Sequence, residues 1–266
     1  MPLYTLKRMR LSLPPVCVAP ARCYICAMII AKPVPILSDN YAWLLTETES
    51  GCVAIVDPAE FGLVARAIDA AGRLDMILIT HHHGDHIAAV DEVRAKYPAP
   101  VVGARADAHR LPRLDRQVWE GSGVDLGTAT AQVMETPGHT VGHISYFFPE
   151  GAVLLCGDTL FSLGCGRLLE GTPADMFGSL MKFAALPGDT LVCAGHEYTQ
   201  SNAAFALHAD PENLDLHAFS QRIDELRAIG MPTLPSRLSD ELECNPFLRA
   251  TDIAMLADLR SRKDRF

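Results

Sequence analysis

Short apolar runs alternate with turns rich in glycine, proline and aspartate from Met28 to about His196. The runs are rich in β-branched and aromatic residues and are bounded by turn residues, which predicts a series of β-strands. The expected strands cover residues 29–36, 41–47, 52–57, 76–80, 100–104, 129–136, 143–148, 152–158 and 190–195.

Between some of these strands the apolar residues are spaced three and four apart, which predicts amphipathic helices over residues 61–71 and 87–96. The pattern changes after Gly195. From Thr199 to Phe266 we expect no strand, only helical stretches at 199–208, 212–229 and 250–262. Strands with interleaved helices predict a layered α/β fold, here followed by a small α-helical C-terminal domain.

Composition places the chain among ordinary globular proteins. It has 266 residues, of which 49% are hydrophobic and 21% charged, enough for one main core with a small appended domain. The formal net charge of -9 and the lack of a dense basic block argue against a nucleic-acid partner. The apolar runs are strand-sized, whereas a membrane span needs ~20 residues. We therefore expect no membrane partner, and we expect a monomer.

The first 38 residues contain five lysines and arginines and no acidic residue. Residues 1–27 are open to three interpretations: a transit peptide, which would place the protein in mitochondria, a poor signal peptide, or an over-long start. We favour a disordered or mis-started leader, followed by a main domain at 28–196 and a helical domain at 197–266, for which the motifs described below imply catalytic and substrate-binding roles. The eight cysteines fall mostly in apolar runs, so we expect buried free thiols and a cytoplasmic, reducing location. The Cys23-x-x-Cys26 pair has no second pair and is not expected to bind metal.

A dense histidine motif follows directly on the predicted strand MILIT. It reads His81-His82-His83-Gly84-Asp85-His86. If the chain stays extended through 81–83, His81 and His83 point to one side and His82 to the other. Two imidazoles from one side can hold one cation, which leaves Asp85 and His86 for a second.

Three more possible ligands, His139, Asp158 and His196, each stand at or just beyond the end of an apolar strand. Functional residues gather at the carboxyl ends of strands in layered α/β folds, so we expect these side chains to converge. Asp158 is the natural bridge, because a carboxylate has two oxygens and can span two cations. His143 begins a strand nearby and is expected to orient a ligand. The remaining histidines are expected to be structural or exposed.

The motifs resemble those of the metallo-β-lactamase superfamily, and within it glyoxalase II, the hydroxyacylglutathione hydrolases. The superfamily resemblance rests on THHHGDH, TPGHTVGH, GDTLF and AGHEYT. The narrower resemblance rests on PVPILSDNYAWLL, GCGRLLEGT, GHEYTQSN, CNPFLR and the terminal RSRKDRF. It covers the chain from about Met28 to its end and implies a four-layer αββα sandwich followed by a helical domain.

The resemblance also implies a division of roles among the site residues. His81, His83 and His139 would hold one metal ion. Asp85, His86 and His196 would hold the other, with Asp158 as the bridge. The substrate residues implied are Arg167, Tyr198, Asn202, Arg260 and Lys263; Leu169 stands where some relatives carry an aromatic residue. Cations and amide or hydroxyl donors suit glutathione, which has two carboxylates and peptide groups.

The implied activity is thioester hydrolysis of S-D-lactoylglutathione to glutathione and D-lactate, the second step of methylglyoxal detoxification. Two cations lower the pKa of a bridging water from ~15.7 towards ~7, so that hydroxide can attack the thioester carbonyl. Asp85 would help to orient it, and with His143 makes up the expected catalytic pair. Zinc is the expected metal, with iron or manganese as alternatives. The competing interpretations are a persulfide dioxygenase-like mono-iron oxidoreductase and a non-enzymatic metal-binding module.

Overall fold

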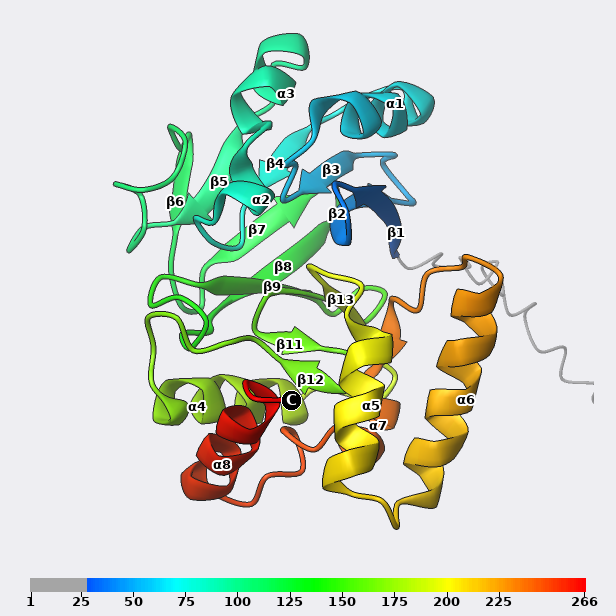
Figure 1. Ribbon diagram of the computed structural model, residues 1–266. Coiled ribbons are helices and arrows are strands. Elements are labelled where there is room, and N and C mark those ends of the chain that lie inside the picture. Colours follow the sequence, from blue (N-terminus) through cyan, green and yellow to red (C-terminus); the bar gives the residue numbers. More distant parts are fainter. Residues whose placement is uncertain (1–27) are drawn as a thin grey trace, which may run out of the picture.

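Two six-stranded β-sheets form the centre of the molecule in a computed structural model that describes residues 28–266 (Figure 1). The leader expected at residues 1–27, with its Cys23-x-x-Cys26 motif, lies outside the described residues. The first sheet contains, in spatial order, β1 (Ile29–Ile36), β2 (Asn40–Glu47), β3 (Val53–Val56), β4 (Met76–Leu78), β5 (Val101–Ala104) and β6 (Arg116–Val118). The second contains β14 (Ser236–Arg237), β13 (Leu191–Ala194), β10 (Val153–Gly157), β9 (Ile144–Phe148), β8 (Ala129–Glu135) and β7 (Gly123–Leu126).

Helices cover the outer faces of both sheets, so the expected αββα order of layers is confirmed. Helices α1 (Phe61–Ala71) and α3 (Val90–Lys96) pack on the first sheet (Figure 1). The helices beyond the second sheet are α4 (Pro173–Ala184), α5 (Thr199–Ala209), α6 (Leu214–Ala228), α7 (Leu238–Cys244) and α8 (Ile253–Lys263). No helix within residues 28–266 combines the length and apolar character needed to cross a bilayer.

The central strands of the first sheet, β2 to β5, are buried on both faces, which explains their continuous apolar runs. In β3, Val53 and Ile55 pack with the helix layer, whereas Ala54 and Val56 pack in the core between the sheets. A strand that meets helices on one side and a second sheet on the other has no solvent face, so polar residues would be costly at every position.

Several predicted boundaries need correction. The helix expected at 87–96 is two helices, α2 (Gly84–Ile87) and α3, so the histidine motif itself runs into the first turn of α2. Helices α4 and α7 were not expected. Helix α4 does carry a local start signal, because Thr172 and Asp175 form a capping box around Pro173.

The expectation that the C-terminal part lacks strands is wrong. Strand β14 pairs antiparallel with β13 and so extends the second sheet. It is only two residues long, too short to produce a periodic pattern. Leu234 and Leu238 on either side of it join the core between the layers.

A short hairpin, β11 (Leu160–Phe161) and β12 (Gly164–Cys165), links the second sheet to the C-terminal helices (Figure 1). Its backbone is held from the C-terminal part of the chain. Asn245 Nδ2 donates to the carbonyls of Phe161 and Gly164 at 3.1 and 3.0 Å. Helix α7 adds Glu241, whose carboxylate accepts from the backbone N–H of Leu163 at 2.8 Å. The hairpin is therefore positioned by the C-terminal segment.

Replacing the fully buried Asn245 by alanine should leave two carbonyls of the hairpin unsatisfied. We expect a loss of about 1–3 kcal/mol in the free energy of unfolding, because buried acceptors lose water without gaining a partner. The urea unfolding midpoint of the metal-free protein measures this loss. Gln200→Ala, which removes an exposed hydrogen bond to Asp224, is the control and should leave the midpoint nearly unchanged.

Candidate metal centre

The histidine motif begins three residues after the end of β4 and continues to Gly84, where α2 starts; the backbone of His83 just before that helix is extended. As the alternation predicts, His81 Nε2 and His83 Nδ1 lie 3.1 Å apart on one side. The ring of His82 turns the other way, with Nδ1 3.1 Å from a carboxylate oxygen of Asp107.

His139 joins this pair from the loop that follows β8. Its Nε2 lies 3.0 Å from His83 Nδ1. The ring nitrogens of His81, His83 and His139 all lie within 4.8 Å of one another, a grouping able to hold a metal ion. Three imidazole nitrogens directed at one point suit a divalent cation of borderline softness.

A second group of potential ligands contains Asp85, His86 and His196, again within 4.8 Å of one another. Asp158 stands between the two groups. Its Oδ1 lies 3.3 Å from His86 Nε2, and its Oδ2 lies 3.3 Å from His196 Nε2 and 3.5 Å from His139 Nε2. One carboxylate therefore faces both groups, so the seven residues form one dinuclear arrangement.

Two buried atoms at the centre of this arrangement fit the expected cations. His86 Nε2 and Asp158 Oδ1 lie 3.3 Å apart, but neither makes a hydrogen bond of acceptable geometry within residues 28–266. A buried polar atom without a partner costs about 1–3 kcal/mol, so native proteins rarely leave one without an explanation. Lone pairs that converge on a shared space are the donor set that a bound cation would satisfy.

Around one strongly acidic carboxyl group, the centre lowers the pKa of some imidazoles and raises that of others, His86 and His196 among them. Burial lowers the pKa of His81 and of His143 well below the usual range. Burial alone would raise the pKa of Asp158, but His86 and His196 outweigh it and hold that pKa well below the usual range. Burial opposes the charged form of His86 too, yet Asp158 and Asp57 raise its pKa. A proton on His86 thus balances the carboxylates, and a bound cation would take its place.

Three of the potential ligand histidines, His86, His139 and His196, form a hydrogen bond outside the centre through the second ring nitrogen. Asp57 holds His86 Nδ1 at 3.0 Å, and Asp39 holds His196 Nδ1 at 2.9 Å. The carbonyl of Arg167 lies 2.9 Å from His139 Nδ1. These partners fix each ring so that its other nitrogen faces the site.

Asp57 and Asp39 were missed in the sequence. Asp57 ends the run CVAIVD just as Asp158 ends VLLCGD, so the same signal was available. The backbone of Asp57 has φ 51°, a conformation that aspartate tolerates better than most residues, and its carboxylate also accepts from the N–H and hydroxyl of Thr80.

His143 lies beneath the centre rather than in it. Its ring stacks on that of His81 with the centroids 4.9 Å apart, and its Nε2 accepts from the backbone N–H of Asp158 at 3.2 Å. Asp85, the other member of the expected catalytic pair, has a side chain that is 44% exposed and accepts from Asn40 Nδ2 at 3.0 Å. Of the two, Asp85 is partly exposed, whereas His143 is buried and contacts the ring of His81 and the backbone of Asp158.

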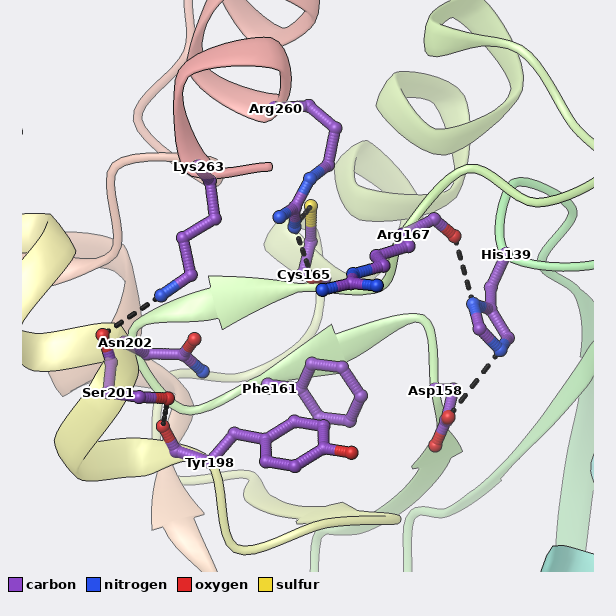
Figure 2. Close-up of a pocket in the computed structure, with 10 residues that line it drawn as sticks. All are labelled: His139, Asp158, Phe161, Cys165, Arg167, Tyr198, Ser201, Asn202, Arg260 and Lys263. Atoms are coloured by element: carbon purple, nitrogen blue, oxygen red, sulfur yellow. Dashed lines mark hydrogen bonds and ion pairs between the residues drawn. The ribbon is translucent and has the colours of Figure 1, made fainter. Parts of the chain in front are cut away.

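A cavity of about 410 Å³ opens beside the centre, as Figure 2 shows. His139 and Asp158 lie at one end, and Lys263 and Ser201 lie at the other (Figure 2). All five expected substrate residues line it, namely Arg167, Tyr198, Asn202, Arg260 and Lys263. Its lining also includes Phe161, Cys165 and Ser201, which were not predicted. Leu169 is 60% exposed and is not among the lining residues.

Two of the lining residues, Arg260 and Asn202, also form hydrogen bonds that fix one wall of the cavity. Arg260 Nη1 donates to the carbonyl of Cys165 at 2.8 Å, and Asn202 Nδ2 donates to the carbonyl of Ser162 at 3.0 Å. Both acceptors belong to the β11–β12 hairpin. Arg260 is nearly buried and is paired with Asp264 as well. These two side chains therefore position the hairpin that forms one wall of the cavity.

Comparisons with known proteins agree with this fold and site. The family described as "Metallo-beta-lactamase superfamily" matches residues 37–196, and "Hydroxyacylglutathione hydrolase C-terminus" matches residues 197–266. Among solved structures, the crystal structure of ETHE1 from Myxococcus xanthus has a TM-score of 0.66 at 24% identity, covering 87% of this chain and 90% of that one. The chain is a member of the metallo-β-lactamase superfamily, and its groups of histidine and aspartate side chains suggest a dinuclear metal site.

Curated relatives narrow the family. A hydroxyacylglutathione hydrolase of Acidiphilium cryptum is 53% identical over 234 residues, which cover 88% of this chain and 95% of that protein. Another, from Ruegeria pomeroyi, is 49% identical over 248 residues and covers 88% of this chain and 97% of that one. The chain belongs to the hydroxyacylglutathione hydrolase family, as the sequence motifs indicated.

Replacing Asp57 by asparagine should weaken metal binding without removing a ligand. Aspartate accepts from the backbone N–H of Thr80 through one oxygen and from His86 Nδ1 through the other. Asparagine has only one oxygen and cannot replace both bonds, so the ring of His86 loses its fixed orientation. We expect one metal equivalent to bind about 10–100-fold more weakly, measured by competition with a chromophoric chelator. Asp115→Asn is the control. The carboxylate of Asp115 accepts from the backbone N–H of Val101, and this variant should bind metal normally.

Proposed function

We propose that this protein hydrolyses S-(2-hydroxyacyl)glutathione thioesters, S-D-lactoylglutathione among them, to glutathione and a 2-hydroxy acid. The observation that carries the proposal is the single cavity that joins Asp158 and His139 to a cationic end at Lys263. A thioester carbonyl at the first end leaves room for the peptide part of the substrate to reach the second. The volume lies within the range of about 300–1,000 Å³ typical of small-molecule sites.

The cavity lining suits the chemistry of glutathione. Arg167, Arg260 and Lys263 supply positive charge for its two carboxylates. Tyr198 supplies a hydroxyl donor: burial, followed by the nearby carboxylates, raises the pKa of Tyr198 to about 12, so its phenol stays protonated. Its ring stacks on that of His196, 4.6 Å away, which sets the hydroxyl beside the metal centre.

The proposal includes two divalent cations, with zinc as the expected metal and iron or manganese as alternatives with the same ligands. One would be held by His81, His83 and His139, the other by Asp85, His86 and His196, with Asp158 bridging. When bound, such cations lower the pKa of water from ~15.7 towards ~7 and offset negative charge on the attacked oxygen.

The protein's own groups orient the reactants. Asp85 is partly exposed, and Asn40 fixes one of its oxygens, so the other can accept a hydrogen bond from the attacking water. The leaving group is a thiolate with a solution pKa of ~8.5, which departs without a dedicated general acid. This is consistent with the cavity lining, in which Asp158, the proposed bridge, is the one carboxylic acid.

The competing interpretations have less support. The match of residues 197–266 to the hydroxyacylglutathione hydrolase C-terminus favours the thioesterase over a mono-iron oxidoreductase of the same superfamily. A cavity that combines a substrate-sized volume with a metal centre disfavours a purely structural metal site. All the groups named come from one chain, so we propose a monomer as the active unit, acting in the reducing cytoplasm.

The purified protein loaded with zinc should hydrolyse S-D-lactoylglutathione, and Asp158→Ala should abolish this activity and lower the metal content to one equivalent or less. Without the shared carboxylate, two like charges would face each other unbridged. Thioester absorbance and metal analysis on the same sample measure both effects. Full activity of the variant with two bound metals would contradict the bridging role.

Replacing Lys263 by alanine should raise KM by about ten- to a hundredfold, because one charge-assisted contact to the substrate is lost. Metal content should not change. The kcat should stay closer to that of the wild type, because a contact to a remote part of the substrate contributes mainly uniform binding. Equal losses on a thioester without the glutathione carboxylates would show that Lys263 is not a substrate contact.

The same residue predicts a pH dependence. Burial, with a smaller contribution from Arg260, lowers the pKa of Lys263 to about 8. The ammonium that attracts a carboxylate is present below this pH and is lost above it, so kcat/KM should fall as the pH rises past 8. Lys263→Arg keeps its charge throughout this range, so the ratio of wild-type to variant kcat/KM should decline between pH 7 and pH 9.

A further inference from the structure

Three charged side chains lie on the outer side of the histidine motif, where His82 points away from the metal centre. Asp107, just beyond the carboxyl end of β5, has a side chain only 2% exposed. Arg110 pairs with Asp107 at 2.6 Å and with Glu170 at 2.5 Å. We refer to Asp107, Arg110 and Glu170 as the outer charge cluster. None of the three lines the cavity or belongs to a group of potential metal ligands.

The cluster reaches the ligand motif through His82. Asp107 Oδ2 lies 3.1 Å from His82 Nδ1, and the other ring nitrogen lies 3.3 Å from Arg110 Nη1. The ring of His82 therefore lies between a carboxylate and a guanidinium group. The fixed ring of His82 restrains the backbone that joins His81 and His83, whose rings face the opposite side.

The cluster reaches the His139 loop through Glu170. A carboxylate oxygen of Glu170 accepts from the backbone N–H of Val141 at 2.9 Å. The backbone N–H of Glu170 donates to the carbonyl of His139 at 3.3 Å. Three residues before Glu170, the carbonyl of Arg167 holds the ring of His139. Glu170 therefore connects the loop of His139 to the segment that orients its imidazole.

Close packing at Gly142 brings these loops together. A Cβ atom at Gly142 would lie 2.1 Å from the carboxylate of Asp107. Only glycine allows the His139 loop to pass this near to the buried acid. The cluster is also internally satisfied, since Arg110 faces two carboxylates, and its hydrogen bond to Glu170 lowers the pKa of that carboxyl to about 2. Glu170 therefore stays charged across the physiological range.

We propose that the outer charge cluster is a positioning device for the first metal group: it fixes the His81–His83 strand and the His139 loop relative to each other. Asp107, Arg110 and Glu170 are positioning residues for the hydrolysis proposed above, and the inference rests on that function. Asp107 is buried, and Arg110 and Glu170 are partly exposed. Paired charges that include a buried member have demanding geometry, so a cluster of this kind restricts the loops to one arrangement.

The test uses the full chain loaded with Co²⁺, whose visible d–d bands report the geometry of its ligands. In Glu170→Gln and in Arg110→Met, one of the two cobalt equivalents should bind at least tenfold more weakly, and its bands should shift. With zinc, kcat on S-D-lactoylglutathione should fall about ten- to a hundredfold while KM changes less than threefold. The double variant should be no worse than the poorer single variant, because the two residues act as one unit.

Two controls separate positioning from general stability. Lys96→Met and Asp69→Asn break an exposed ion pair of 2.8 Å between α1 and α3, and both should retain wild-type cobalt affinity, spectrum and kcat. Arg110→Lys keeps the charge without the two-pronged geometry and should recover only part of the metal affinity. If Arg110→Met does not fold, Glu170→Gln, at a position with more solvent access, decides the matter.

Wild-type cobalt affinity and bands in Glu170→Gln, with only a lower melting temperature, would overturn the proposal and leave the cluster a purely structural one. The cobalt titration does not depend on substrate. If the wild-type enzyme fails to hydrolyse S-D-lactoylglutathione, the proposed function fails while the metal data still decide the role of the cluster.

Discussion

The carboxylate of Asp158 is the constraint on which the rest of the structure depends. It is buried between two groups of imidazoles, within 3.5 Å of ring nitrogens of His86, His139 and His196. A buried charge is tolerated only where opposite charge and hydrogen bonds compensate for lost water. The centre can meet this condition with a proton on His86 or with metal ions. Asp158 Oδ1 and His86 Nε2 make no hydrogen bond of acceptable geometry within residues 28–266, which favours metal ions over the proton as the compensating charge.

The αββα fold satisfies this constraint by bringing the ends of strands from both sheets to one edge. The histidine motif follows β4 of the first sheet, whereas His139, Asp158 and His196 follow β8, β10 and β13 of the second. Because β4, β10 and β13 are buried on both sides, their ends cannot shift without disturbing two layers of packing. The outer partners, such as Asp57 on His86, then set ring orientations that the strands alone would leave free.

The parts of this architecture that could be predicted from sequence are those encoded locally. The strand over 29–36 and the helix over 61–71 match their predicted bounds, since each has an uninterrupted pattern of its own. The ligands were found because each follows an apolar run. Strand β14 and the β11–β12 hairpin were not predicted, because two-residue strands exist only through their tertiary partners. The outer charge cluster was missed for the same reason: Arg110 and Glu170 are 60 residues apart and have no local signature.

The C-terminal segment does more than add substrate contacts. Arg260, Asn202 and Asn245 all donate to carbonyls of the β11–β12 hairpin, and the segment after that hairpin leads within two residues to Arg167. The carbonyl of Arg167 orients His139. A continuous set of hydrogen bonds and two covalent steps therefore joins helix α8 to a potential metal ligand. The side chains that would receive glutathione are thus built into the same framework as the metal centre, so substrate binding and metal geometry are set together.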